Sequence, residues 1–350
     1  MKNYIVFDLE WNQSPKGKQD SLEEMPFEII EIGAVKLDEN FRLVGEFHRL
    51  ICPQVYQKIH YMTSDVTHIT MEELRKQGKF FPEAADDFLD WCGRNAVFCT
   101  WGSMDLMELQ RNLAYYAMEI PFPRPLLFYD VQKLYGLFYK DGAKPSLDAS
   151  VEELELLEDR AFHRALDDAY YTARVLMHLA ENPGANAFLP YQSIDYYWLP
   201  ENKKEEIRMV FPGYSKYVSR IFPSKEDAMK DRGVTRIQCY ECGRALRAKI
   251  RWFTPNQKIY HSLAVCPEHG WVRGKIRLKK VDEPRVFVVK TLKLTDEAGA
   301  AIVAARREDV RKKRSERNKA KKQRLQEEKK TASPAKRASR KSRRNKANKV

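Results

Sequence analysis

The feature that most constrains this chain is an apolar stretch at its start that ends in two carboxylates. A buried strand is predicted by the β-branched and aromatic residues of Tyr4-Ile5-Val6-Phe7-Asp8-Leu9-Glu10. Residues i and i+2 of a strand share a face, so Asp8 and Glu10 point the same way. Two such carboxylates on a core strand are unfavourable unless cations lie between them. For this pair taken alone, an exposed strand edge is the alternative interpretation.

Further carboxylates and a histidine follow at positions that can converge on the same place. Asp105 comes just after a predicted strand, Asp168 lies on a predicted helix, and His163 lies at the start of that helix. In an open α/β sheet, groups at strand ends and on a helix face can meet in one cleft. Taken singly, each residue also fits a helix cap, a solvated helix charge or a loop histidine.

Four carboxylates around one point would bind two hard divalent cations through oxygen. Such a pair of ions activates a water molecule and stabilises the leaving oxygen of a phosphodiester. A neutral imidazole nearby can accept the proton of that water. The residue pattern therefore predicts a metal-dependent phosphodiesterase site.

The order of predicted elements indicates an α/β fold in residues 1–182. Three strands joined by short turns come first, and alternating strands and helices follow, which predicts a mixed five-stranded sheet flanked by helices. Asn182-Pro183-Gly184 is the expected end of this domain. The expected strands are 4–10, 27–37, 41–51, 96–101 and 126–130, and the clearest expected helices are 82–92, 105–118, 131–138, 147–157 and 163–179.

Three motifs resemble those of the DEDDh branch of the DEDD exonuclease superfamily, whose members are DnaQ-like. They are Phe7-Asp8-Leu9-Glu10, Trp101-Gly102-Ser103-Met104-Asp105 and His163-Arg164-Ala165-Leu166-Asp167-Asp168-Ala169. The sister branch has a tyrosine where this chain has Arg164. The second motif, together with Ser64-Asp65-Val66-Thr67-His68-Ile69-Thr70 and Phe81-Pro82-Glu83-Ala84, is most similar to the subgroup that trims RNA 3′ ends. The resemblance covers residues 1–182.

This resemblance implies a ribonuclease-H-like fold and removal of nucleoside 5′-monophosphates in the 3′→5′ direction. It implies two Mg²⁺ or Mn²⁺ ions, with Asp8, Glu10 and Asp168 as ligands of the catalytic ion. Asp8 would also reach the second ion, Asp105 would support it through water, and His163 would be the general base.

The same motifs supply candidate substrate contacts, which are Leu9, Trp11 and Trp101. Many relatives carry a small residue after the glutamate of the first motif, whereas this chain has Trp11. Its indole either stacks on a terminal base or caps the core, and the sequence leaves both interpretations open.

The second half of the chain has a metal-binding pattern of another kind. Cys239-x-x-Cys242 and Cys266-x-x-His269 are two pairs with zinc-ligand spacing, each followed by a glycine. They predict one structural Zn²⁺ in a zinc-ribbon-like β domain over residues 236–295, with free thiols as the alternative. A closed set of four ligands leaves no position for a catalytic water.

Charge is distributed unevenly along the chain, whose formal net charge is +13. Residues 1–180 are acidic on balance, whereas residues 181–350 are basic. The acidic first part of the chain suits binding of divalent metal ions, and the basic second part suits binding of a polyanion. Around the predicted zinc site, basic residues alternate with aromatic ones, which is typical of single-strand binding but also of a solvated surface. The residues concerned are Arg244, Arg247, Lys249, Arg251, Trp252, Phe253, Tyr260, Trp271, Arg273, Lys275, Arg277, Lys279 and Lys280.

Two further segments carry less information. Residues 183–235 are expected to be an aromatic-rich connector, whose rings pack on the first domain or form a base-stacking platform. Residues 296–350 are expected to form a basic tail. Residues 296–330 could be a long charged helix, but no apolar stripe follows Val310, so little stable helix is expected there without a partner, and residues 331–350 are expected to be disordered. Such a tail would attract RNA, DNA or RNA–protein assemblies such as the ribosome without sequence choice.

Taken together, these features predict a soluble cytoplasmic 3′→5′ exonuclease that prefers RNA. The N-terminus has no signal-peptide pattern, no apolar run is long enough to span a membrane, and the cysteines do not form a disulfide framework. A DNA exonuclease with the same chemistry is the first alternative. A nucleic-acid-binding protein that uses the nuclease domain only as a scaffold is the second.

Overall fold

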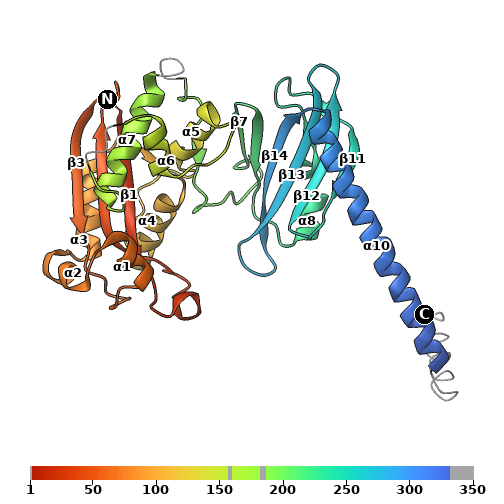
Figure 1. Cartoon of the computed structure of the whole chain (residues 1–350), viewed down its shortest axis with the longest axis horizontal. Coiled ribbons are helices and arrows are strands. Elements are labelled where there is room, and N and C mark those ends of the chain that lie inside the picture. The colour runs from red at the N-terminus through yellow and green to blue at the C-terminus, as the bar shows by residue number, and fades with distance from the viewer. Residues whose placement is uncertain (1, 157–159, 182–186, 332–350) are drawn as a thin grey trace. The chain divides into compact units, whose positions relative to one another are not determined.

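The computed structural model describes residues 2–156, 160–181 and 187–331. The chain divides into two compact units, Met1–Leu199 and Pro200–Val350 (Figure 1). Within the described ranges, no helix is both long enough and apolar enough to cross a membrane. The expected domain end at 182–184 and the last part of the basic tail, residues 332–350, lie outside the described residues.

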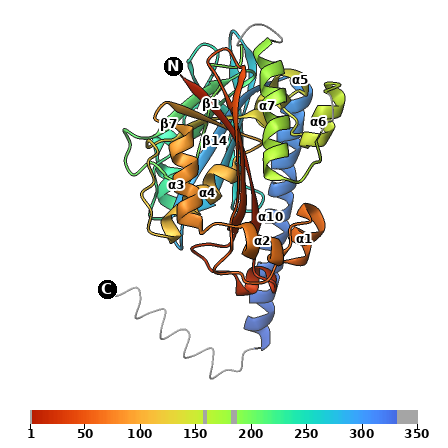
Figure 2. The same ribbon diagram turned by 90° about the vertical axis from the view of Figure 1, so that its left-hand side faces the viewer.

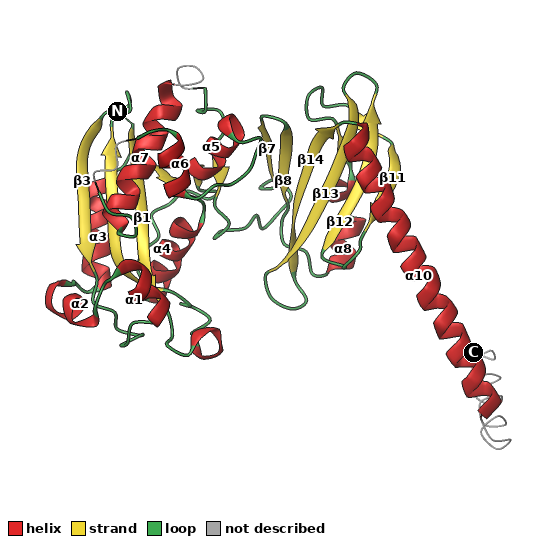
Figure 3. Ribbon diagram, viewed as in Figure 1, coloured by secondary structure: helices red, strands yellow, loops and turns green. Residues whose placement is uncertain are grey.

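The first unit is built on a mixed six-stranded sheet with the order β3-β2-β1-β4-β5-β6. Figure 3 shows strands of this sheet in yellow and the helices beside it in red. β2 pairs antiparallel with β1 and β3, whereas β1, β4 and β5 run parallel, because helices connect them. The strands are β1 (Asn3–Asn12), β2 (Glu28–Leu37), β3 (Leu43–Leu50), β4 (Ala96–Thr100), β5 (Leu127–Asp130) and β6 (Ser193–Ile194).

Helices cover both faces of this sheet (Figure 2). α3 and α4 pack on the face to which Ile5, Phe7 and Leu9 of β1 point, and α5, α6 and α7 pack on the face of Tyr4 and Val6. The helices are α1 (Tyr61–Thr67), α2 (Met71–Gln77), α3 (Phe81–Cys92), α4 (Met104–Tyr115), α5 (Val131–Tyr139), α6 (Leu147–Glu153) and α7 (Ala165–Glu181), and a 3₁₀ turn, η1, spans Gly17–Asp20.

The predicted α/β class with a mixed sheet is confirmed, but the expected number of five strands is wrong. The sixth strand, β6, pairs antiparallel with β5 and comes from the segment expected to be a connector. A strand of two residues has no apolar alternation for a sequence pattern to reveal. Its existence depends on backbone hydrogen bonds to a strand more than sixty residues earlier in the chain.

The second unit contains a second six-stranded sheet, with the order β11-β12-β13-β14-β8-β7. All its pairs are antiparallel, as expected for strands joined by short turns. The expected connector thus contributes two strands to this sheet. The strands are β7 (Ile207–Phe211), β8 (Tyr214–Val218), β11 (Ala248–Phe253), β12 (Ile259–Cys266), β13 (Gly270–Lys280) and β14 (Val286–Thr295).

Smaller elements complete the second unit. α8 (Lys225–Lys230) and α9 (Arg232–Thr235) lie on one face of its sheet, and a separate hairpin pairs β9 (Ile237–Gln238) with β10 (Ala245–Leu246). The possible charged helix near the C-terminus is present as α10 (Glu297–Thr331), and it continues past Val310, where little stable helix was expected. Ala300 and Val303 in its first turns are buried against the other face of the sheet, and the side chains that follow Val310 and are described are exposed.

Candidate active site and metal centre

The alternation of β1 places Asp8 and Glu10 on the same face of the first sheet. Odd-numbered side chains of the strand, such as Phe7 and Leu9, are buried with α3 and α4. Asp8 and Glu10 therefore project toward the face that α7 covers. The expectation that both carboxylates share one face is met by this geometry.

Gly33 allows α7 to come close enough to bring a third carboxylate to this face. It lies opposite Asp8 in the β1–β2 pair, and a Cβ added there would lie 2.0 Å from the backbone nitrogen of Leu166. Only glycine tolerates so close an approach between a strand and a helix. As a result, carboxylate oxygens of Asp8, Glu10 and Asp168 all lie within 4.8 Å of one another.

Asp105 adds a fourth carboxylate from the first turn of α4. It is buried, and its carboxylate accepts hydrogen bonds from its own backbone N–H and from the backbone N–H of Leu9. The paired part of β1 and β4 ends at Val6, so the Leu9 N–H has no strand partner on that side. Asp105 is not within 4.8 Å of all three other carboxylates, but its charge acts on Asp8 and Glu10.

The four carboxylates are held where their negative charge is unfavourable. Burial, and then the charges of Asp105 and Glu10, raise the pKa of Asp8 well above its usual range. Burial and the charge of Asp168 raise the pKa of Glu10 to about 8. Burial raises the pKa of Asp105 to about 7 and that of Asp168 to about 6, against hydrogen bonds that lower them. A group of this kind needs protons or divalent cations, and its all-oxygen donor set suits Mg²⁺ or Mn²⁺.

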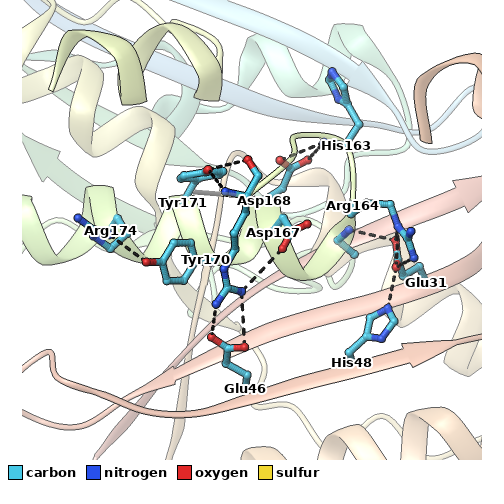
Figure 4. Close-up of polar contacts among 12 residues, drawn as sticks. Glu31, Glu46, His48, His163, Arg164, Asp167, Asp168, Tyr170, Tyr171 and Arg174 are labelled. Carbon is cyan, nitrogen blue, oxygen red and sulfur yellow. Dashed lines mark hydrogen bonds and ion pairs between the residues drawn. The ribbon is translucent and has the colours of Figure 1, made fainter. Parts of the chain in front are cut away.

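A fifth acidic residue, Glu31, lies directly opposite Glu10 on β2 but has a different environment (Figure 4). Burial would raise its pKa, but hydrogen bonds from His48, Arg164 and the Ala165 N–H lower it below its usual value. Arg164 Nη2 lies 2.7 Å from Glu31 Oε1, and His48 Nε2 lies 2.7 Å from the same oxygen. Glu31 is therefore ionised and already neutralised by protein groups.

Glu31 and its partners were not among the sequence-predicted site residues. The available signal was a charged residue inside the otherwise apolar run Ile29-Ile30-Glu31-Ile32. That signal marks Glu31 as unusual but does not name Arg164, which is 133 positions away. Because Arg164 and Ala165 are adjacent to the start of α7, their bonds to Glu31 fix that end of the helix against β2.

His163 is close to Asp168 through its backbone rather than through its ring. Its N–H lies 3.3 and 3.2 Å from the two Asp168 oxygens, and its φ of +69° is in the left-handed region. The side chain is exposed, and the imidazole points away from Asp168 (Figure 4). The predicted placement of the ring beside the carboxylates is therefore not seen in this structure.

The three candidate substrate contacts lie mainly within the core. Leu9 is buried among the residues beneath α3 and α4, and Trp11 packs against that cluster with its ring centroid 5.7 Å from that of Phe27. Trp101 packs on the opposite face, 6.4 Å from the ring of Tyr135. These positions favour the core-capping interpretation of Trp11 over base stacking.

The four predicted zinc ligands come together at one end of the second sheet. Cys239 and Cys242 flank the turn between β9 and β10, and Cys266 and His269 flank the turn between β12 and β13. Sulfur and nitrogen ligand atoms of all four residues lie within 4.8 Å of one another.

Individual distances fit the edges of a zinc tetrahedron. Cys242 Sγ lies 3.7 Å from Cys266 Sγ, and His269 Nδ1 lies 3.6 Å from the sulfurs of both Cys239 and Cys266. Zn–S bonds of about 2.3 Å in a tetrahedron require sulfur separations of about 3.8 Å. Burial raises the pKa of Cys266, but hydrogen bonds from His269 and from the backbone lower it to about 6 overall. The donor set therefore fits Zn²⁺.

Comparison with known proteins supports the same interpretation of the first unit. Residues 5–176 match the family model described as Exonuclease. A probable 3′-5′ exonuclease, KapD, from Bacillus subtilis is 29% identical over 182 residues, which are 51% of this chain and 83% of that protein. A PolC-type DNA polymerase III from Thermotoga petrophila is 34% identical over 154 residues, which are 44% of this chain. The chain spans only 11% of that polymerase's length.

Among solved structures, the nuclease domain of 3′hExo, described as a DEDDh family member bound to rAMP, is similar to 56% of this chain. The similar region covers 96% of that domain, with 21% sequence identity and a TM-score of 0.45.

The first unit has a mixed sheet with helices on both faces and clustered carboxylates on its central strand and neighbouring helices, as in the predicted ribonuclease-H-like fold of a nuclease domain. The match over residues 5–176 makes the assignment more specific. This part of the chain belongs to the exonuclease family, and its motifs are those of a DEDDh-type 3′-5′ exonuclease domain.

Proposed function

We propose that this protein removes nucleoside 5′-monophosphates from the 3′ ends of single-stranded RNA with the help of two Mg²⁺ or Mn²⁺ ions. The observation that carries the proposal is the gathering of Asp8, Glu10 and Asp168 oxygens within 4.8 Å. Their raised pKa values show that the protein alone does not compensate their charge. Two divalent ions would supply an activated water and stabilisation of the leaving oxygen.

Each carboxylate has a distinct role in this proposal. Asp8, Glu10 and Asp168 hold the ion that orients the attacking water, and Asp8 also reaches the second ion. Asp105 supports the second ion through water, which agrees with its greater separation from the group of three. Its hydrogen bond from the Leu9 N–H ties the start of α4 to β1 and so maintains the distance between the two halves of the site.

We assign the general base to His163, whose ring must turn toward the carboxylates for this role. The backbone N–H of His163 is held by Asp168, so the residue stays next to the site while its exposed side chain rotates. Rotation about side-chain bonds of an exposed residue is fast compared with turnover. Once turned inward, a ring nitrogen accepts the proton of the attacking water.

RNA is the proposed substrate because the second motif and the stretches near Ser64 and Phe81 are similar to those of RNA-trimming members of the superfamily. The similarity to the PolC-type DNA polymerase III favours the second candidate, a DNA 3′-5′ exonuclease with the same chemistry. A non-catalytic scaffold is the third, and the compact carboxylate group argues against it.

We further propose that one Zn²⁺ binds Cys239, Cys242, Cys266 and His269 and joins the β9–β10 hairpin to the β12–β13 turn. The role is structural, because a set of four protein ligands leaves no open position. None of the six cysteines forms a disulfide, which supports the proposed location in the reducing cytoplasm. The basic tail would add non-specific affinity for RNA or for RNA–protein assemblies such as the ribosome.

The test uses RNA and DNA single strands of identical sequence, labelled at the 5′ end, with Mg²⁺, Mn²⁺ or no metal. A ladder of 3′-shortened products and released 5′-monophosphates from RNA supports the proposal, whereas the same products from DNA alone support the second candidate. Asp8→Asn, which keeps the side-chain shape, is the matched inactive variant. Release from neither strand, or full activity of Asp8→Asn, would overturn the mechanism.

A further inference from the structure

One face of the second unit's sheet carries basic side chains that the exonuclease site does not use. It is the face on which α10 packs, because Leu263 of β12 shares a buried cluster with Ala300 and Val303 of α10. Arg273 lies directly opposite Leu263 in the β12–β13 pair, and directly paired residues share a face. Lys275 and Arg277 lie on the same side of β13 as Arg273, because alternate residues of a strand share a face.

Neighbouring elements extend this basic surface. Lys293 of β14 pairs with Arg273, and His261 of β12 pairs with Lys275. The charge of Arg306, one turn beyond Val303 on α10, acts on both His261 and Lys275. We name this set the basic face: His261, Arg273, Lys275, Arg277, Lys293 and Arg306.

The charges of the basic face are not balanced by acidic groups. Among the described residues, none of Arg273, Lys275 and Arg277 forms an ion pair with a carboxylate, and like charges side by side on a sheet are destabilising. Burial and the charges of Arg277, Arg306 and Arg273 lower the pKa of Lys275 below its usual value. The acidic residues that follow on α10 are paired elsewhere, Glu308 with Arg311 and Asp309 with Lys313.

The structure also separates the aromatic residues that the sequence places among these charges. Trp252 and Tyr260 belong to the opposite face, where they pack with Met229, and Trp252 Nε1 donates to the Thr235 carbonyl at 2.7 Å. Trp271 is packed against the first turns of α10. Phe253 pairs with His261 on the basic face, with 5.9 Å between the ring centroids.

We propose that the basic face binds the sugar-phosphate backbone of single-stranded nucleic acid. Alternate residues of an extended strand lie about 6.8 Å apart, a spacing comparable to that of successive phosphates in an extended single strand. Phe253 and His261 at the edge of the face offer ring surfaces for a base. This proposal rests on the proposed function in one respect only, which is that the bound strand is the substrate of the exonuclease.

The test measures binding of fluorescein-labelled oligo(U) of about 15 nucleotides, which is within the range of single-strand binding sites. The full chain carries Asp8→Asn, so that the strand is not degraded. The variant is the triple substitution Arg273→Gln, Lys275→Gln and Arg277→Gln. We expect at least about tenfold weaker binding at low salt, and a slope of log K against log salt reduced by about 2, because each phosphate contact contributes about 0.7.

A matched control removes three positive charges from another part of the same unit. Lys225→Gln, Lys230→Gln and Arg232→Gln lie on α8 and α9, which pack on the opposite face, and should change the affinity by less than about twofold. Circular dichroism checks that both triple variants remain folded.

Three results would overturn the proposal. Both triple substitutions could weaken oligo(U) binding equally, or neither could weaken it. Poly-glutamate could also bind as tightly as oligo(U) and be weakened as much by the basic-face substitutions. The last result would assign the face to acidic polypeptides instead. Hydrolysis of the p-nitrophenyl ester of thymidine 5′-monophosphate, measured with native Asp8, reports on the carboxylate site without a strand. If the protein with native Asp8 does not hydrolyse this ester while the binding results are as expected, the proposed function is contradicted and the binding surface is retained.

Discussion

Arg164 and Glu31 form an ion pair with two hydrogen bonds to a single carboxylate oxygen, 2.7 Å from Nη2 and 3.1 Å from Nε. Glu31 is almost fully buried, whereas the Arg164 side chain is about one-third exposed. The pair joins β2 to the segment that leads into α7, and α7 carries Asp168. One electrostatic contact thus supports the position of Asp168, whose backbone N–H also donates to the Arg164 carbonyl at 2.9 Å.

Arg164→Met should destabilise the first unit by about 2 kcal/mol or more, because removal of one partner leaves a buried carboxylate uncompensated. His48 retains part of the compensation, which keeps the loss below that of a fully isolated charge. Urea unfolding measures the change in the free energy of unfolding. Arg174→Met is the control, because Arg174 lies on α7, the helix that follows Arg164, and donates to the Tyr170 hydroxyl. Adding Glu31→Gln to Arg164→Met should restore part of the lost stability. A double variant with the same free energy of unfolding as Arg164→Met would contradict this explanation.

Gly33→Ala should displace α7 from the sheet and separate Asp168 from Asp8. The new Cβ would clash with backbone atoms of Ala165 and Leu166. These atoms cannot move aside as easily as the end of a flexible side chain. We expect a loss of about 3 kcal/mol or more, at the upper end for overpacking. The control is Gly45→Ala in β3, where the nearest atom, on the Trp91 ring, is 3.7 Å away. Equal melting temperatures for the two variants would show that the close approach is unimportant.

Without metal, the first unit should lose stability as the pH rises from about 4 to about 8. The folded-state pKa values of Asp168, Asp105 and Glu10, about 6, 7 and 8, all lie above the value of about 4 expected in the unfolded chain. Their contribution to stability is fully present below pH 4 and is lost as the pH rises through the folded-state values.

Other groups also titrate, so the measurement compares metal-free wild type with Asp8→Asn by urea unfolding at several pH values. The variant lacks one of the repelling carboxylates and should lose less stability over the same range. Mg²⁺ or Mn²⁺ should remove most of the wild-type decline. If the difference in free energy of unfolding between wild type and Asp8→Asn stays constant with pH, this account of the site is ruled out.

Removal of zinc should unfold the end of the second unit where its ligands lie. Cys242→Ser, or a strong chelator applied to the wild type, should lower the melting temperature and abolish the content of about one zinc ion per chain. Cys52→Ser changes a thiol in the other unit and should keep the zinc. Zinc content is measured by metal analysis of the purified protein. A fully folded, zinc-free wild-type protein would exclude a structural ion.

Patterns within a single element predicted which neighbouring side chains lie together. Alternation along β1 is enough to place Asp8 and Glu10 together, and ligand spacing within one turn is enough to place Cys239 near Cys242 and Cys266 near His269. In both cases the geometry is set by residues a few positions apart. The mixed α/β arrangement was predictable for a similar reason, because connection length determines whether neighbouring strands are parallel or antiparallel.

Features that depend on pairing between distant segments were not predictable in this way. The contact of Glu31 with Arg164 and the fit of Gly33 beneath Leu166 exist only because β2 and α7 pack together. β6, β7 and β8 acquire their structure from β5 and β14, which lie far away in the sequence. His163 has a local backbone conformation with positive φ, for which its sequence gives no clear signal.

The passage of α7 over Gly33 has a consequence for a chain that is still being synthesised. Asp8 and Glu10 leave the ribosome first, but their third partner is carried by the last helix of the first unit. A nascent chain that stops before this helix has no complete cation pocket, whatever else has already folded. The order in which the polypeptide emerges therefore makes the carboxylate cluster one of the later features of this unit to be completed.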